Sequence, residues 1–167
     1  MRTLDLFQQI APSYDANFIL AHFAKKFAAV PTEVLTTRIE EFLKFMFLRS
    51  TYHQGFIPLT GEVDDIWHEF ILQTREYEKL CKALPGGEFI HHNSVHLEDF
   101  SKNKDRTDVV RDLINWLPRY YKNFGSFNEE AAQYWMMVSF LRAELKLSLE
   151  QINHLAQKAI NSNFTTV

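Results

Sequence analysis

Apolar residues recur every three or four positions along most of this sequence, and this spacing is typical of helices that bury one face. The clearest run predicts a helix over residues 60–84, with Thr60 as its N-terminal cap. Its stripe alternates steps of four and three residues and consists of Val63, Trp67, Phe70, Thr74, Tyr77, Cys81 and Leu84. The same spacing predicts further helices over residues 14–30, 32–49, 109–121, 129–145 and 148–160. The pattern therefore indicates about six helices.

Residues that break or cap helices support these boundaries. Pro85 ends the clearest helix, because proline cannot donate the backbone hydrogen bond that a helix needs. Pro118 lies inside another apolar period, so we expect a bend near Trp116. Ser148 and Gln151 have the spacing of a capping box, which predicts the start of the last helix.

The composition fits an all-α fold. The 167 residues include only five glycines and five prolines, whereas 46% of residues are apolar and 15 are phenylalanine. Such a chain has few turn residues and enough apolar side chains for one compact core. We expect a single all-α domain over residues 1–167, an irregular bundle of about six helices, with a core motif at residues 60–92 and a frayed tail at residues 161–167.

Charge and hydropathy narrow the class of protein further. The formal net charge is −3, so the chain has no overall basic field and a nucleic-acid partner is not expected. The longest uncharged apolar stretch, residues 131–141, is shorter than the roughly 20 residues of a membrane-spanning helix. Asp5 interrupts the apolar core that a signal peptide would need, and the single cysteine, Cys81, cannot form an internal disulfide. We therefore expect a soluble, cytoplasmic protein without a signal peptide or a transmembrane helix.

Aspartate and histidine residues in the core motif are the candidate metal ligands. Asp64 and His68 lie one turn apart on one face of the predicted helix, and His91 and His92 follow that helix. Carboxylate and imidazole groups bind divalent metals such as zinc, so these four residues form a candidate metal site. In an extended segment His91 and His92 would point to opposite sides, so at most one of them would reach His68. Side chains of this kind more often form a structural hydrogen-bond network, and we expect that arrangement ahead of a bound metal.

Standard catalytic motifs are absent from the sequence. Residues 68–72 read HEFIL, which begins like the zinc-protease motif HExxH but has Leu72 where the second histidine must stand. Any metal site must therefore draw its ligands from more than one segment. Cys81 belongs to the apolar stripe and is expected to be an inert core residue.

The core motif also resembles a known family. Residues 63–92 combine a Trp-His pair, Thr74, Tyr77, Cys81, a Gly-x-Phe step and a His-His pair. This combination is similar to the core of the plant glycine-rich domain-containing proteins and their small bacterial relatives. The resemblance implies that Asp64, Trp67, His68, His91 and His92 form one cluster, and it implies no particular reaction. The chain lacks the glycine-rich tail of the larger members.

Two functions follow from these observations. The first is a small helical interaction module that binds a protein partner in a groove between helices, with a cluster that is structural or holds a metal. The alternative is a metal-dependent hydrolase in which Asp64, His68 and either His91 or His92 hold zinc, with Glu69 or Glu88 as the general base. Glu69 points about 100° away from His68 around the helix, which favours Glu88. The sequence leaves open whether the protein is an enzyme and what its oligomeric state is.

Overall fold

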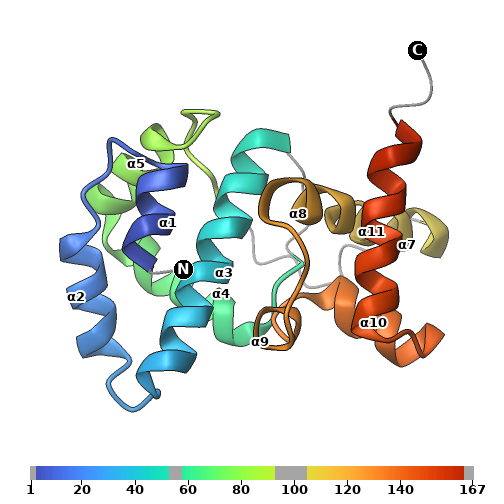
Figure 1. Ribbon diagram of the computed structural model, residues 1–167. Coiled ribbons are helices and arrows are strands. Elements are labelled where there is room, and N and C mark those ends of the chain that lie inside the picture. The colour runs from blue at the N-terminus through green and yellow to red at the C-terminus, as the bar shows by residue number, and fades with distance from the viewer. Residues whose placement is uncertain (1–2, 53–57, 93–104, 164–167) are drawn as a thin grey trace. The chain divides into compact units, whose positions relative to one another are not determined.

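The computed structural model describes residues 3–52, 58–92 and 105–163, and this part of the chain is helical. Its elements, labelled in Figure 1, are α1 (Thr3–Ile10), α2 (Asn17–Lys26), α3 (Thr32–Tyr52), α4 (Gly61–Leu72), α5 (Thr74–Ala83), α7 (Arg106–Ile114), α8 (Trp116–Phe124), α9 (Glu129–Ala132), α10 (Met136–Leu145) and α11 (Leu149–Asn163). Among these residues the only β-type pairing is one isolated antiparallel bridge between Leu59 and Trp135. The all-α class is confirmed, and the expected six helices are an undercount.

The described residues form two compact units. The first contains α1 to α5 and the segment after α5 as far as His91, and the second contains residues 58–60, His92 and α7 to α11. The single domain over residues 1–167 stays a prediction.

In the first unit α3 packs against α1 and α4, and α4 packs against α5 (Figure 1). Aromatic side chains from these helices and α2 fill the core, and those almost fully buried are Phe7, Phe23, Phe42, Phe45, Trp67, Phe70 and Tyr77. The spacing analysis did not predict α1, because eight residues are too few to show a convincing helical period. The helix is stabilised by burying Leu6, Phe7 and Ile10.

The predicted helix over residues 60–84 is in fact two helices, and that prediction is wrong. α4 ends at Leu72, Gln73 adopts a non-helical conformation, and α5 begins at Thr74. No side chain caps the start of α5, so no local sequence signal marks the break. In a straight helix the ten steps from Trp67 to Tyr77 would span about 15 Å, whereas here Trp67 Nε1 lies 2.9 Å from the Tyr77 hydroxyl. The break therefore lets both side chains enter one core.

In the second unit α8 packs against α11, and α10 packs against α7, α8 and α11. Aromatic rings make its core, with Tyr120 and Phe127 stacked at a centroid distance of 3.7 Å. Asn153 on α11 holds the turn that carries Phe127. The Phe127 N–H donates to Asn153 Oδ1 at 2.8 Å, and Asn153 Nδ2 donates to the Phe127 carbonyl at 2.9 Å.

The single helix predicted over residues 129–145 is also wrong. It is divided into α9 and α10, because the backbone between them bonds to residues 58–60 instead of continuing the helix. The Thr60 N–H donates to the Tyr134 carbonyl at 3.1 Å, and the Met136 N–H donates to the Pro58 carbonyl at 2.7 Å. Because these partners are distant in sequence, the residues near the break between α9 and α10 contain no signal that predicts it.

Other boundaries are confirmed. α7 ends at Ile114 and α8 starts at Trp116, with Pro118 in the first turn, where a missing N–H costs nothing. The capping box is present, since the Ser148 N–H donates to Gln151 Oε1 at 2.8 Å and the Gln151 N–H donates to Ser148 Oγ at 3.2 Å. α11 continues to Asn163 beyond the expected end at residue 160, and residues 164–167 of the expected frayed tail lie outside the described residues. None of the helices in the described residues is long and apolar enough to cross a membrane.

Candidate metal centre

One side of α4 carries a carboxylate and an imidazole that face each other. Asp64 lies in the first turn, where its charge interacts favourably with the helix dipole, and His68 follows one turn later. His68 Nδ1 lies 3.4 Å from Asp64 Oδ2, and the side chains are 50% and 29% exposed, respectively. This pair is therefore accessible from solvent.

His92 brings a third donor to the pair. One donor atom from each of Asp64, His68 and His92 can be chosen so that all three lie within 4.8 Å of one another. His92 is half-buried, and it directly follows His91, the last residue of the first unit. The structure thus brings together three of the four residues that the sequence suggested as metal ligands.

The buried side of α4 fixes the segment that leads to His92. Trp67 Nε1 donates a hydrogen bond to the Tyr77 hydroxyl at 2.9 Å, and that hydroxyl donates to the Ile90 carbonyl at 2.5 Å. Trp67 and Tyr77 are fully buried and Ile90 is 7% exposed. Burial also raises the pKa of the Tyr77 hydroxyl, so it stays a neutral donor. The sequence placed Tyr77 on the buried stripe but gave no sign of its hydrogen bond to residue 90.

Other residues of the core motif lie away from the metal group. His91 is exposed, and its ring lies 4.9 Å from that of Phe89, so these two side chains share the outward side of the segment. Thr74 is exposed at the start of α5, although the stripe had placed it on the buried face. Cys81 is buried as expected, and burial raises the pKa of its thiol, which makes it a poor nucleophile.

The separation of Asp64 and His68 is compatible with a shared metal ion. A strong N–H···O hydrogen bond spans about 2.7–3.2 Å, and the observed separation is 3.4 Å. Two ligands of one tetrahedral zinc ion, each about 2.0–2.2 Å from the metal, lie about 3.3–3.6 Å apart. The pair already has this spacing, and the donor atom of His92 lies within 4.8 Å of both.

Glu69 is directed away from this group. Its carboxylate accepts a hydrogen bond from His22 Nε2 at 2.7 Å and lies 3.0 Å from Lys26 Nζ, both on α2. The hydrogen bond from His22 is the main reason why the pKa of Glu69 is lowered. Glu69 thus joins α2 to α4 and is not positioned to act as a base at the metal group. The sequence analysis did not foresee this contact, because His22 and Glu69 are far apart in the chain.

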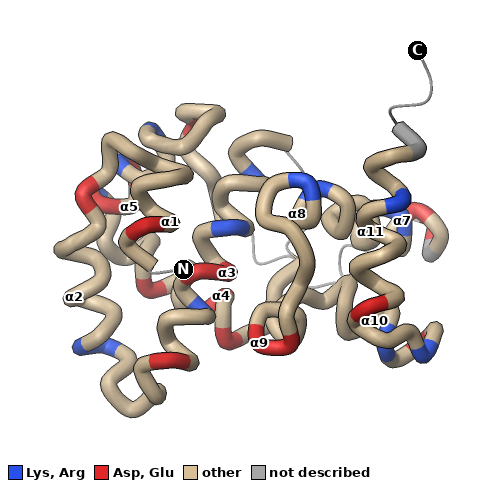
Figure 2. The backbone as a smooth tube through the Cα atoms, in the orientation of Figure 1, with Lys and Arg blue, Asp and Glu red and all other residues tan. Residues whose placement is uncertain are grey.

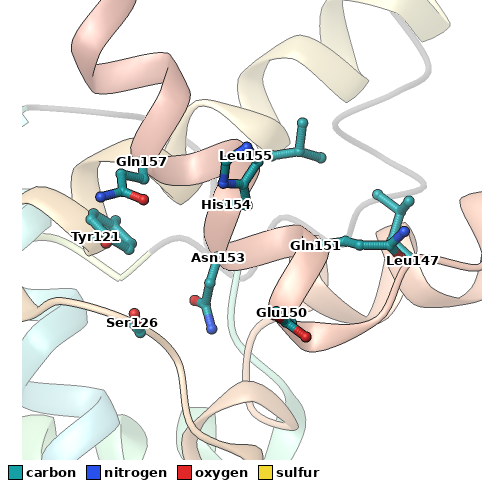
Figure 3. A pocket seen from close by; sticks show the side chains of 9 residues that line it. All are labelled: Tyr121, Ser126, Leu147, Glu150, Gln151, Asn153, His154, Leu155 and Gln157. Carbon is teal, nitrogen blue, oxygen red and sulfur yellow. The ribbon is translucent and has the colours of Figure 1, made fainter.

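A separate surface pocket lies in the second unit. Figure 3 shows Tyr121 of α8 and side chains of α11, including His154 and Gln157, around a hollow of about 560 Å³. Most of its lining side chains are exposed, and Gln151 and Asn153 already hold the capping box and the Phe127 turn. It contains no residue of the metal group.

Basic and acidic residues are interspersed in the described part of the chain. Figure 2 shows lysine and arginine positions spread over several helices with acidic positions between them. Several of the lysines are neutralised locally, as Lys26 is by Glu69 and Lys82 is by Glu78.

Fold and site together define an all-helical protein with a partly exposed Asp-His-His donor group. A family model matches residues 10–156, and the chain belongs to the UCP032817-like family, which is uncharacterised. The resemblance to the glycine-rich domain-containing proteins is therefore wrong, since it rested on about thirty residues whereas the family match spans most of the chain. No curated protein and no solved structure matches this sequence.

Proposed function

We propose that this protein binds a divalent transition-metal ion such as zinc through Asp64, His68 and His92. The observation that carries the proposal is the convergence of their donor atoms to within 4.8 Å of one another. Two imidazoles and one carboxylate favour zinc and similar ions over magnesium or calcium, which prefer oxygen ligands alone. Glu62 and Asp65, exposed near Asp64 on the first turns of α4, add negative potential that attracts a cation.

The donor set supports metal binding more directly than hydrolysis. Three protein ligands leave one position of a tetrahedral ion for water or another ligand, as in catalytic zinc sites. A hydrolase would also need a base beside that position, and Glu69 is held by His22 and Lys26 while Glu88 is exposed. Metal binding is therefore the proposed function. A protein partner and a cytoplasmic location remain predictions.

Elemental analysis of protein purified without an affinity tag tests the proposal. We expect about one zinc or similar ion per chain after zinc is supplied, and loss of that ion in His68→Ala and His92→Ala with the helical circular dichroism retained. His154→Ala is the matched control, because His154 is exposed on α11 outside the donor group. His91→Ala should also keep the metal. Absence of metal from the wild type, or equal metal in His68→Ala, would contradict the proposal.

A further inference from the structure

We propose that Tyr77 is a positioning residue for the metal centre, whose hydroxyl holds the segment before His92 in the place that metal binding requires. This inference rests on the proposed function. Tyr77 itself touches no ion. Its effect passes through the backbone of residue 90 to the ligand two residues later.

The chemistry of the indole, hydroxyl and carbonyl groups fixes which one donates in each of the two hydrogen bonds of Tyr77. An indole N–H can only donate, so the Tyr77 oxygen accepts from Trp67 at 2.9 Å. A carbonyl can only accept, so the single proton of the Tyr77 hydroxyl goes to Ile90, at 2.5 Å. Trp67 is one residue before the ligand His68 on α4, and Ile90 is two residues before the ligand His92. One hydroxyl therefore joins the two segments that supply the metal group.

Alternating exposure along the segment shows how the bond orients His92. Phe89 is 48% exposed and its ring lies against that of exposed His91, whereas Ile90 is 7% exposed and His92 is half-buried. In an extended chain, residues two apart point to the same side. His92 thus points to the same side as Ile90, so fixing Ile90 directs the His92 ring towards α4.

The helix break at Gln73 allows the Tyr77 hydroxyl to make both hydrogen bonds. Because α5 departs from the line of α4, the Tyr77 hydroxyl reaches both the Trp67 indole and the chain beyond Pro85. Without the hydroxyl, the indole N–H and the Ile90 carbonyl would both be left without this buried partner. The segment would then have to be ordered when the metal binds, and that cost lowers the affinity.

Zinc titration against a competing chelator tests the inference in the full chain. In Tyr77→Phe we expect the Kd for zinc to rise about tenfold or more, the range found for groups that orient metal ligands. Tyr14→Phe is the matched control, because it removes a hydroxyl of the same unit that bonds Glu76 at 3.3 Å, outside the metal group. Its Kd should equal that of the wild type. A Tyr77→Phe Kd within twofold of the wild type would overturn the inference and leave the proposed function intact, whereas wild-type protein that binds no zinc would overturn both.

Two readouts separate positioning from a general loss of stability. With cobalt as the bound ion, Tyr77→Phe should show a weakened tetrahedral visible absorption at equal occupancy, which a uniformly less stable but undistorted site would not show. In the metal-free wild type, the indole N–H of Trp67 should exchange slowly with solvent, because it is buried and already bonded to the Tyr77 hydroxyl. Free exchange of this indole N–H without metal would overturn the inference even if Tyr77→Phe fails to fold.

Discussion

At the scale of one residue, Gly86 lets the chain after α5 lie directly against the end of α3. Its N–H donates to Ser50 Oγ at 2.8 Å, and Ser50 is buried. A Cβ atom on residue 86 would lie 2.6 Å from the Ser50 carbonyl oxygen and 2.8 Å from Ser50 Oγ. The carbonyl belongs to a helix and cannot move aside easily, so the position excludes any side chain.

Gly86→Ala should therefore lower the free energy of unfolding by about 1–3 kcal/mol, the usual cost of forcing extra atoms into a packed site. Urea unfolding followed by circular dichroism measures the change. Gly61→Ala serves as the control, since a Cβ there meets nothing within 4 Å, and its effect should stay within about 0.5 kcal/mol. Equal stability of the two variants would show that the Ser50 contact is relaxed in solution.

At the scale of helices, the carboxylate of Glu69 joins α4 to α2. The side chain is 9% exposed, and His22 and Lys26 approach it from α2. Since folding lowers the pKa of Glu69, mainly through the His22 hydrogen bond, the ionised form is favoured in the folded state. This contribution to stability is present above the unfolded pKa of about 4.3 and is lost as the pH falls through the lowered folded value.

Glu69→Gln should accordingly cost about 1–2 kcal/mol of stability at pH 7, as for a hydrogen bond to a charged group. The difference from the wild type should shrink as the pH falls below about 4, which urea unfolding at several pH values measures. Glu78→Gln is the comparison, because the pKa of Glu78 is also lowered, by Lys82, but on an exposed face where solvent screens the pair. A Glu69 effect that does not change with pH would disprove the assigned cause.

Helices and breaks differed in how far the sequence could predict them. The break between α7 and α8 was predictable because Pro118 acts on its own neighbourhood. The breaks at Gln73 and before α10 were not, since one has no capping side chain and the other depends on backbone bonds to residues 58–60. A residue such as proline marks a helix break in its own neighbourhood. A break that depends on contacts distant in sequence is visible only in the folded structure.

The candidate site follows the same division. Asp64 and His68 could be paired from the sequence, because residues four apart on a helix are neighbours. The choice between His91 and His92 depends on which side of the segment faces α4, and that is set by the contacts of Ile90 and Phe89. The hydrogen bond between Tyr77 and residue 90 could not be predicted either, because the sequence pattern does not determine how close these two residues lie in space.

At the scale of the whole molecule, the single cysteine offers a test of whether residues 1–167 unfold as one domain. Cys81 is buried in the first unit, whereas helical circular dichroism reports both units. If the chain is one cooperative domain, a short pulse of thiol reagent should label Cys81 at the same urea midpoint at which the helical signal is lost. Labelling at a clearly different midpoint would show that the units unfold separately, and wild-type protein needs no substitution for this measurement.

The bridge between Leu59 and Trp135 has a consequence for how the protein is made. Residues 58–60 lie between α3 and α4 in the sequence, yet they supply the backbone partners of Tyr134 and Met136 in the second unit. During synthesis these residues leave the ribosome long before their partners exist. The second unit therefore cannot be completed until most of the chain has emerged, and a fragment that begins after His92 would lack one edge of it.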